Sequence, residues 1–169
     1  MRTAEYYIEK LNLNRHVEGG SFHETYRSEL VLPTQVLGID FKGSRNASTG
    51  IYFLLEYGQF SAFHRIASDE MWHFYDGNTL TIYEIEPDGT LKKHKLGKDL
   101  DAGETFQCVI KAGNWFGSRC EVKGGFSLSG CTVAPGFDFA DFELADRAQL
   151  CKTYPLHHQL IESLTYNTL

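Results

Sequence analysis

Hydrophobic and polar residues follow the two-residue period of β-strands over most of this chain. The block TGIYFLLEYG is apolar almost throughout and is bounded by glycines, which predicts a strand buried on both faces. The segment SFHETYRS alternates, which puts Glu24 and Tyr26 on one side of a strand and Arg27 on the other. Further short strands are predicted near residues 61–66, 70–75, 79–86, 90–95, 104–110, 115–120 and 125–134.

A helical period replaces this pattern at both ends of the chain. Near the N-terminus, apolar residues recur at i, i+3, i+4 and i+7 from Ala4, with Thr3 as the cap. Near the C-terminus, Pro155 stands at the first turn of a last helix. The apolar stripe of that helix is Leu156, Leu160, Ile161 and Leu164. The segment LVLPTQVLGIDFKGSRNAST, with its proline and glycines, predicts a long loop or ragged hairpin. The expected fold is a closed β-sandwich or barrel with terminal helices, one domain over 1–169.

Composition supports a β-rich fold and excludes two classes of partner. Aromatic residues make up 14% of the chain, and the net charge is −6. Lysine and arginine never occur in runs longer than two, so a binding surface for nucleic acid is not expected. No apolar stretch approaches the roughly 20 residues of a membrane span, and MRTAEYYIEK has no apolar signal core. We therefore expect a cytoplasmic protein with no membrane partner.

The four cysteines are expected to be reduced thiols. They are Cys108, Cys120, Cys131 and Cys151, and no two of them form a Cys-x-x-Cys pair. A zinc ribbon or a thioredoxin-type motif is therefore not expected, and the thiols should lie partly buried, mostly in strands.

The stretch YGQFSAFHRIASDEMWHFYDG, residues 57–77, combines imidazoles, carboxylates and aromatic rings, which is how many metal sites begin. Strand alternation puts Glu70, Trp72 and Phe74 on one face and His73 on the other. Only His64 and Glu70 are then expected to meet. Two ligands are too few for a well-held transition metal, so no metal is expected. If a divalent metal binds, its ligands are His64, Glu70 and, after a bulge, His73.

These residues carry a resemblance to the cupin superfamily. Its first motif places Gly, His-x-His, Glu and Gly at fixed spacings, and Gly58, His64, Glu70 and Gly77 match it, with Ile66 where the second histidine belongs. The segment KAGNWFGSRC resembles the second motif, with Phe116 where its histidine belongs. Both missing histidines are metal-ligand positions, so the resemblance supports the barrel much better than the metal.

The chain is most similar to the cupin group known as DUF985 or cupin_5. The shared segments are VEGGSFHETYRS, GIYFLLEYGQFSAFHRIASDEMWHFYDG, LTIYEI, AGNWFGS and VAPGFDFADFELADR. The resemblance implies a double-stranded β-helix, the jelly-roll barrel of cupins, usually as a homodimer, with a polar pocket in the barrel mouth. The role of these proteins is largely unsettled, and they have been compared with sugar-nucleotide epimerases of the RmlC type. That analogy concerns the fold and does not fix a function.

The candidate site follows from alternation in the barrel and from the resemblance. As catalytic residues we predict His64, a base or acid with a pKa near neutrality, Glu70, which orients it or carries a second proton, and Tyr83. As ligand-binding residues we predict Glu24, Tyr26, Arg27, Trp72, Phe74 and Phe116. Arg27 is expected to grip a carboxylate or phosphate with both arms of its guanidinium.

Three functions remain open at this point. The first is a cupin that binds a small polar or sugar-nucleotide-like molecule and acts as an epimerase or isomerase without a metal. The second is a metal-dependent dioxygenase or isomerase using His64 and Glu70. The third is a ligand-binding module without catalysis. The sequence does not name the substrate or decide whether the chain is an enzyme.

Overall fold

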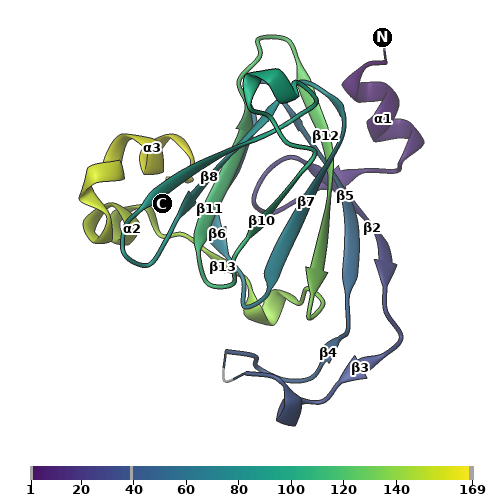
Figure 1. Cartoon of the computed structure of the whole chain (residues 1–169), viewed down its shortest axis with the longest axis vertical. Coiled ribbons are helices and arrows are strands. Elements are labelled where there is room, and N and C mark those ends of the chain that lie inside the picture. The colour runs from purple at the N-terminus through teal and green to yellow at the C-terminus, as the bar shows by residue number, and fades with distance from the viewer. Residues whose placement is uncertain (1, 39, 168–169) are drawn as a thin grey trace.

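The computed structural model describes residues 2–38 and 40–167, most of which form two β-sheets that face each other (Figure 1). The larger sheet has the strand order β1-β2-β5-β12-β7-β10, with bounds Asn14–Arg15, Ser21–Arg27, Thr49–Glu56, Phe126–Ala134, Asp69–Gly77 and Gln107–Ile110. The smaller sheet has the order β13-β6-β11-β8-β9, with bounds Glu143–Leu144, Phe60–Arg65, Trp115–Cys120, Leu80–Ile85 and Leu91–Leu96. This arrangement is the two-sheet sandwich with short terminal helices that the sequence predicts.

The apolar block around β5 is buried on both faces, as predicted. Phe53 and Leu55 point into the core between the sheets. Leu54 points the other way and packs under helix α1 (Ala4–Lys10), where it contacts the cluster of Ala4 and Tyr7. A strand covered on both sides needs apolar residues at successive positions, which is why β5 shows no alternation.

The smaller sheet is covered on its outer face by the C-terminal helices α2 (Arg147–Thr153) and α3 (His158–Ser163), joined by the 3₁₀ turn η4 (Pro155–His157) (Figure 1). In β8, Leu80 and Ile82 belong to the core between the sheets, whereas Tyr83 and Ile85 pack against α2 and α3. Alternation therefore places Tyr83 on the outer side of the sandwich.

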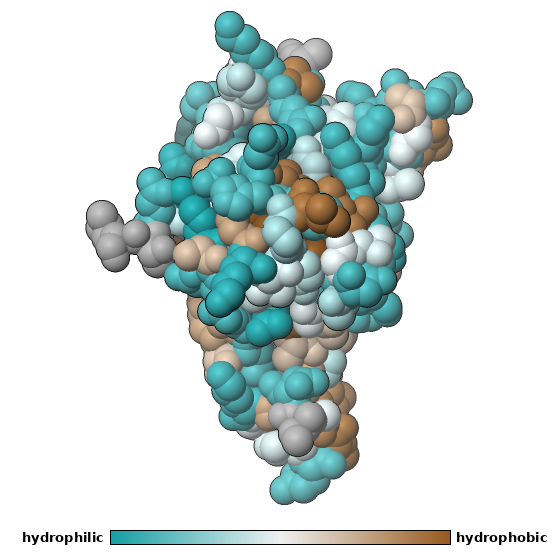
Figure 2. All heavy atoms as spheres, turned by 90° about the vertical axis from the view of Figure 1, so that its left-hand side faces the viewer, coloured by the Kyte–Doolittle hydropathy of each residue, from teal (hydrophilic) through white to brown (hydrophobic). Residues whose placement is uncertain are grey.

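One member of the predicted C-terminal stripe is placed differently. Ile161 and Leu164 are fully buried, but Leu156 is 93% exposed. Leu156 lies in η4, a tighter turn that precedes α3, so it does not follow the helical period of the residues after it. Figure 2 shows this side of the molecule as mainly hydrophilic, with an apolar patch near its centre.

A two-stranded arm projects from the sandwich between β2 and β5 (Figure 1). It consists of β3 (Val31–Leu32), the 3₁₀ turn η1 (Thr34–Val36) and β4 (Arg45–Asn46), which confirms the predicted ragged hairpin. Arg45 fastens the arm to the 3₁₀ turn η3 (Phe139–Asp141), because its Nε and Nη2 donate to both carboxylate oxygens of Asp141 at 2.6 and 2.5 Å. Both side chains are 5% exposed, so the pair is buried.

The cysteines are all free thiols, which confirms that prediction. Three of them lie in strands β10, β11 and β12, and Cys151 lies in α2. Among the described helices, none has the length and apolar character required to cross a membrane.

Candidate functional site

A cavity of about 260 Å³ opens on the inner face of the larger sheet. Its walls come from strands β2, β5, β6, β7 and β12 and from the two segments around residues 16–18 and 137–139. The lining residues are His16, Glu18, Phe22, Glu24, Arg27, Thr49, Ile51, Phe53, His64, Ile66, Glu70, Trp72, Cys131, Val133, Phe137, Asp138 and Phe139. We call its exposed members, Glu24, Arg27, Asp138 and Phe139, the mouth, and the buried set Glu18, His64, Glu70 and Trp72 the floor.

A bulge in β2 decides which of its side chains reach the cavity. The register to β5 shifts between Glu24 and Tyr26, so the extra residue reverses the alternation beyond that point. Glu24 and Arg27 therefore both line the cavity, although regular alternation predicts opposite faces for them. Tyr26, predicted as a ligand contact, is 56% exposed and lies outside the lining.

The guanidinium of Arg27 is already engaged within the protein. Its Nε and Nη2 donate to the two carboxylate oxygens of Glu24 at 2.9 and 2.7 Å, and its Nη1 donates to Asn46 Oδ1 and to the Phe137 carbonyl. Arg27 lies at the mouth as predicted, but Glu24 occupies the two-armed position that a carboxylate or phosphate ligand would need.

His64 is fixed in both ring orientation and tautomer. Its ring lies 4.1 Å from the Phe116 ring and 5.3 Å from the Phe142 ring, measured between centroids. Nδ1 lies 2.7 Å from the Ala62 carbonyl oxygen, which can only accept, so Nδ1 carries the hydrogen. The opposite nitrogen, Nε2, is the one that remains available for proton transfer.

The partner of that nitrogen is Glu18. Its Oε2 lies 3.1 Å from His64 Nε2, and its Oε1 accepts from the Ser61 hydroxyl at 2.9 Å. Burial raises the pKa of the Glu18 carboxyl, and burial lowers the pKa of His64. Burial thus disfavours the charged form of each side chain and favours a neutral imidazole beside a protonated carboxyl.

Glu70 is a second buried carboxyl on the floor, 7% exposed. Burial raises its pKa to about 7, an effect that the nearby His64 opposes and the charge of Glu18 reinforces. The Cys131 thiol is its hydrogen-bonding neighbour, and burial holds the pKa of that thiol well above its ordinary value. Near neutral pH, Glu70 is thus able to give or accept a proton.

Trp72 lies two residues beyond Glu70 on the same face of β7 and is 1% exposed. Its indole ring packs edge-on against Phe53, with centroids 5.6 Å apart. Within the described part of the chain, its Nε1 has no hydrogen-bond acceptor. The floor therefore contains one buried donor without a partner.

Glu18 is held in place by a glycine turn that the sequence pattern did not single out. Gly19 and Gly20 have φ angles of +112° and +72°, and the Glu18 carbonyl accepts from the Ala62 N–H and from the Tyr166 hydroxyl at 2.7 and 3.1 Å. The signal in the sequence was an acid followed by two glycines, between a helix and a strand.

Substitution of Gly19 by alanine should disrupt this turn. A Cβ at Gly19 would collide with the Phe60 carbonyl oxygen, and the positive φ is unfavourable for alanine. We expect the free energy of unfolding to fall by more than the roughly 1–3 kcal/mol of backbone strain alone. Urea denaturation measures it, with Gly113→Ala as the control, because Gly113 has φ +79° and open space around it. Equal losses in the two variants would contradict the role of the close contact.

The other residues missed by the sequence pattern are His16, Cys131 and the segment 137–139. His16 Nδ1 accepts from the Glu18 N–H at 3.4 Å, and burial lowers the pKa of His16, so its ring is neutral. Phe137 and Phe139 stand edge to face with centroids 5.0 Å apart beside the mouth. His16 and the segment 137–139 follow irregular turns, where neither strand nor helix periodicity predicts which way a side chain points, whereas Cys131 lies in strand β12.

Besides Tyr26, three predicted site residues lie outside the cavity lining. Phe116 is buried behind the His64 ring, and Phe74 packs at the edge of the core between the sheets. The sequence predicts that Tyr83 supplies a hydroxyl to the cavity, but the structure places this side chain elsewhere. It faces α2 and α3, and its hydroxyl donates to Glu121 at 2.7 Å.

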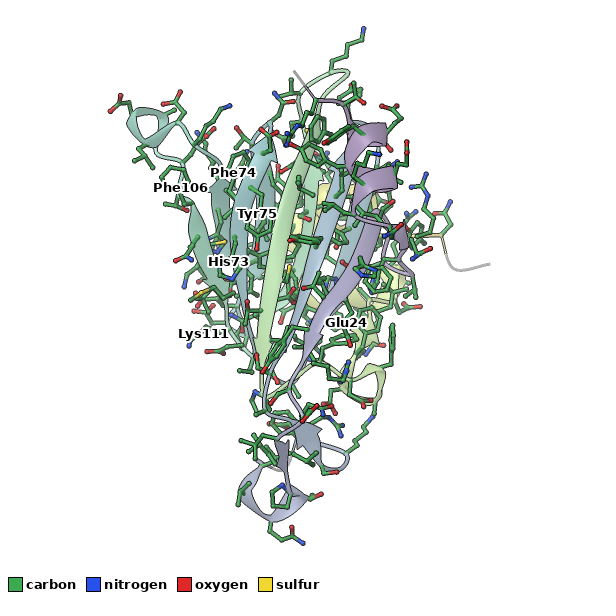
Figure 3. The ribbon with its side chains drawn as sticks, turned by 90° about the vertical axis from the view of Figure 1, so that its right-hand side faces the viewer. Glu24, His73, Phe74, Tyr75, Phe106 and Lys111 are labelled. Atoms are coloured by element: carbon green, nitrogen blue, oxygen red, sulfur yellow. The ribbon has the colours of Figure 1, made fainter. Side chains whose placement is uncertain are left out.

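The residues do not fit the metal site of the cupin motifs. His73 lies on the outer face of the larger sheet, which Figure 3 shows, where it contacts Thr132 Oγ1 at 3.0 Å and Gln107 at 2.9 Å. It is therefore not brought together with His64 and Glu70. Over residues 2–38 and 40–167, no group of three or more His, Cys, Asp or Glu side chains is arranged to hold a metal ion.

Comparison with known proteins places this chain in a family. The profile described as "Cupin superfamily (DUF985)" matches residues 5–145. A crystal structure of a protein from Shewanella oneidensis superposes with a TM-score of 0.88 and 43% identity, covering 99% of this chain and all of that one. An uncharacterised protein of Saccharomyces cerevisiae is 33% identical over 144 residues, which are 79% of this chain and 71% of the yeast protein. A cupin 2 domain-containing protein from Halorhodospira halophila, with TM-score 0.56 and 11% identity over 92% of this chain and 89% of that one, shares the fold alone. The chain therefore belongs to the Cupin_5 (DUF985) family of the cupin superfamily.

Proposed function

We propose that this protein binds a small polar molecule in the cavity and moves protons on it without a metal, as an epimerase or isomerase does. One observation carries the proposal: a buried imidazole and two buried carboxyls share a cavity with no lysine or arginine on its floor. Groups whose pKa values are shifted together at one cavity are a typical signature of acid–base sites.

The geometry supports separate proton-transfer roles for the side chains of strands β6 and β7. On β6, the His64–Glu18 pair can take up a proton at Nε2 once Glu18 has released its own. On β7, Glu70 has a pKa of about 7 and can supply or receive the second proton. Proton removal and return by two separate groups is what inversion or migration at a carbon centre requires.

The test is hydrogen exchange on a defined set of probes. Small cyclic ketones and hydroxy-ketones are incubated with the protein in D₂O, and deuterium uptake at carbon is followed by mass spectrometry. We expect exchange that survives treatment with EDTA and that falls by about a hundredfold or more in His64→Gln and Glu70→Gln.

Two outcomes would favour the other readings. A near-stoichiometric metal after incubation with Fe(II), Mn(II), Ni(II) or Zn(II), absent from His64→Ala, would favour a metal-dependent cupin. Binding without exchange on any probe would favour a module without catalysis.

Two further expectations belong to this proposal, a cytoplasmic location and a homodimer. The outer edge of β2 is paired with β1 only at Ser21 and Phe22 in the described part of the chain, so residues 23–27 offer a free strand edge to a second copy. Sedimentation analysis decides the oligomeric state.

A further inference from the structure

We propose that the cavity takes a small organic cation, a compound with one protonated amine and no phosphate group. This assignment rests on the proposed function, because it names the substrate class of the same cavity. It departs from the comparison with sugar-nucleotide epimerases, whose substrates are polyanions.

The charges of the lining favour a cation. Three carboxyls, Glu24, Glu70 and Asp138, line the cavity against Arg27, the one arginine or lysine among its described lining residues. Glu18 is not counted with them, because burial favours its protonated form. The imidazoles of His16 and His64 do not offset this excess, since burial lowers the pKa of both. A phosphate entering here would meet more negative than positive charge.

The single arginine is also not free to bind an anion. Its Nε and Nη2 both donate to the Glu24 carboxylate, and its Nη1 donates to Asn46 Oδ1 and to the Phe137 carbonyl. The carboxylate of Asp138, the other acid of the mouth, accepts only the Ala140 N–H among the described residues. An anionic ligand would therefore have to displace Glu24 from Arg27.

On the floor, Glu70 lacks a cation. It is 7% exposed, and the titratable groups that act on it are His64, Glu18 and the Cys131 thiol. Ionising a carboxyl in such surroundings costs free energy unless a positive partner is supplied. A protonated amine of the ligand supplies that partner.

Trp72 adds no polar requirement to the ligand. Its side chain belongs to the cavity lining, but it is 1% exposed and its Nε1 is a buried atom, so the indole N–H does not face the open volume.

The walls and the size of the cavity agree with this class. Phe22, Phe53, Phe137 and Phe139 present aromatic rings, and an aromatic ring attracts a cation placed over its face. The volume of about 260 Å³ is below the roughly 300–1,000 Å³ typical of sites for drug-sized ligands. A single ring with short substituents suits it, and a nucleotide sugar does not.

The experiment compares three probes that share one skeleton, 4-methoxybenzylamine, 4-methoxybenzyl alcohol and 4-methoxybenzyl phosphate, by isothermal titration calorimetry. We expect the amine to bind at least about tenfold tighter than the alcohol, and the phosphate not to bind. Tighter binding of the alcohol or the phosphate would overturn the assignment, as would binding of none of the three at millimolar concentration.

Variants connect any preference to the residues that carry the proposal. Glu70→Gln should remove the preference for the amine over the alcohol, whereas Glu143→Gln, which lies outside the cavity, should leave it unchanged. A preference that persists in Glu70→Gln would contradict the role of Glu70. The binding measurement needs no turnover, so the two proposals can fail separately. Amine binding without deuterium exchange would refute only the catalytic proposal. Exchange on neutral probes without amine binding would refute only the assignment of a cationic ligand.

Discussion

Replacing Glu70 with glutamine should make the protein more stable above pH 7, by about 3 kcal/mol. The buried carboxyl has a pKa of about 7 in the folded protein against an ordinary value of 4.5, and each pH unit of difference corresponds to roughly 1.4 kcal/mol. The folded state binds more protons than the unfolded state between these two values. The stability associated with protonated Glu70 is therefore complete below about pH 4.5 and is lost as the pH rises through about 7.

Glutamine has nearly the same shape and stays neutral, so this part of the pH dependence should disappear. Urea denaturation from pH 5 to pH 8.5 measures it, with Glu29→Gln, an exposed acid on the loop after β2, as the control. The Glu70→Gln variant should still lose some stability as the pH rises, because burial raises the pKa of Glu18 as well. Parallel curves for the wild type and Glu70→Gln would show that Glu70 is ionised without cost. The expected gain in stability together with a loss of proton transfer is the trade-off typical of functional sites.

Replacing Arg45 with methionine should lower the free energy of unfolding by about 3 kcal/mol or more. The substitution leaves the Asp141 carboxylate buried and without its cation, and an orphaned buried charge costs about 3–5 kcal/mol. The same substitution should loosen the attachment of the arm to η3, and with it the position of Asp138 and Phe139 at the mouth.

The double variant Arg45→Met with Asp141→Leu serves as the control, since replacing both members of a buried pair by apolar residues often restores stability. Denaturation of the two single variants and the double variant completes the cycle. If the double variant is no more stable than Arg45→Met, the loss comes from packing of the arginine stem and not from the uncompensated charge.

Strand periodicity was sufficient to predict the sandwich and the centre of the floor. The unbroken apolar block of β5 predicted burial on both faces, and helix α1 and the facing sheet provide it. Regular alternation along β7 placed Glu70 and Trp72 on the inner face and His73 on the outer one. These segments are regular, and a two-residue period is then enough to assign a face.

Where the backbone departs from that regularity, the prediction failed. One bulged residue in β2 moved Tyr26 out of the lining and put Arg27 beside Glu24. Tyr83 is a different case, because β8 is regular: alternation with Leu80 and Ile82, which point into the core, places Tyr83 on the other side of the sheet. Glu18 comes from a turn set by two glycines with positive φ, and local periodicity does not reveal which distant strand such a turn contacts.

The hydrogen bond from the Tyr166 hydroxyl to the Glu18 carbonyl joins residues 148 positions apart in the chain. Tyr166 also packs against Phe60, with ring centroids 5.1 Å apart. The C-terminal segment therefore supports the backbone at Glu18, although none of its described residues, up to 167, lines the cavity. Proteolytic trimming that removes Tyr166 would remove this contact, so assays of this protein are best designed with Tyr166 intact and any affinity tag placed elsewhere.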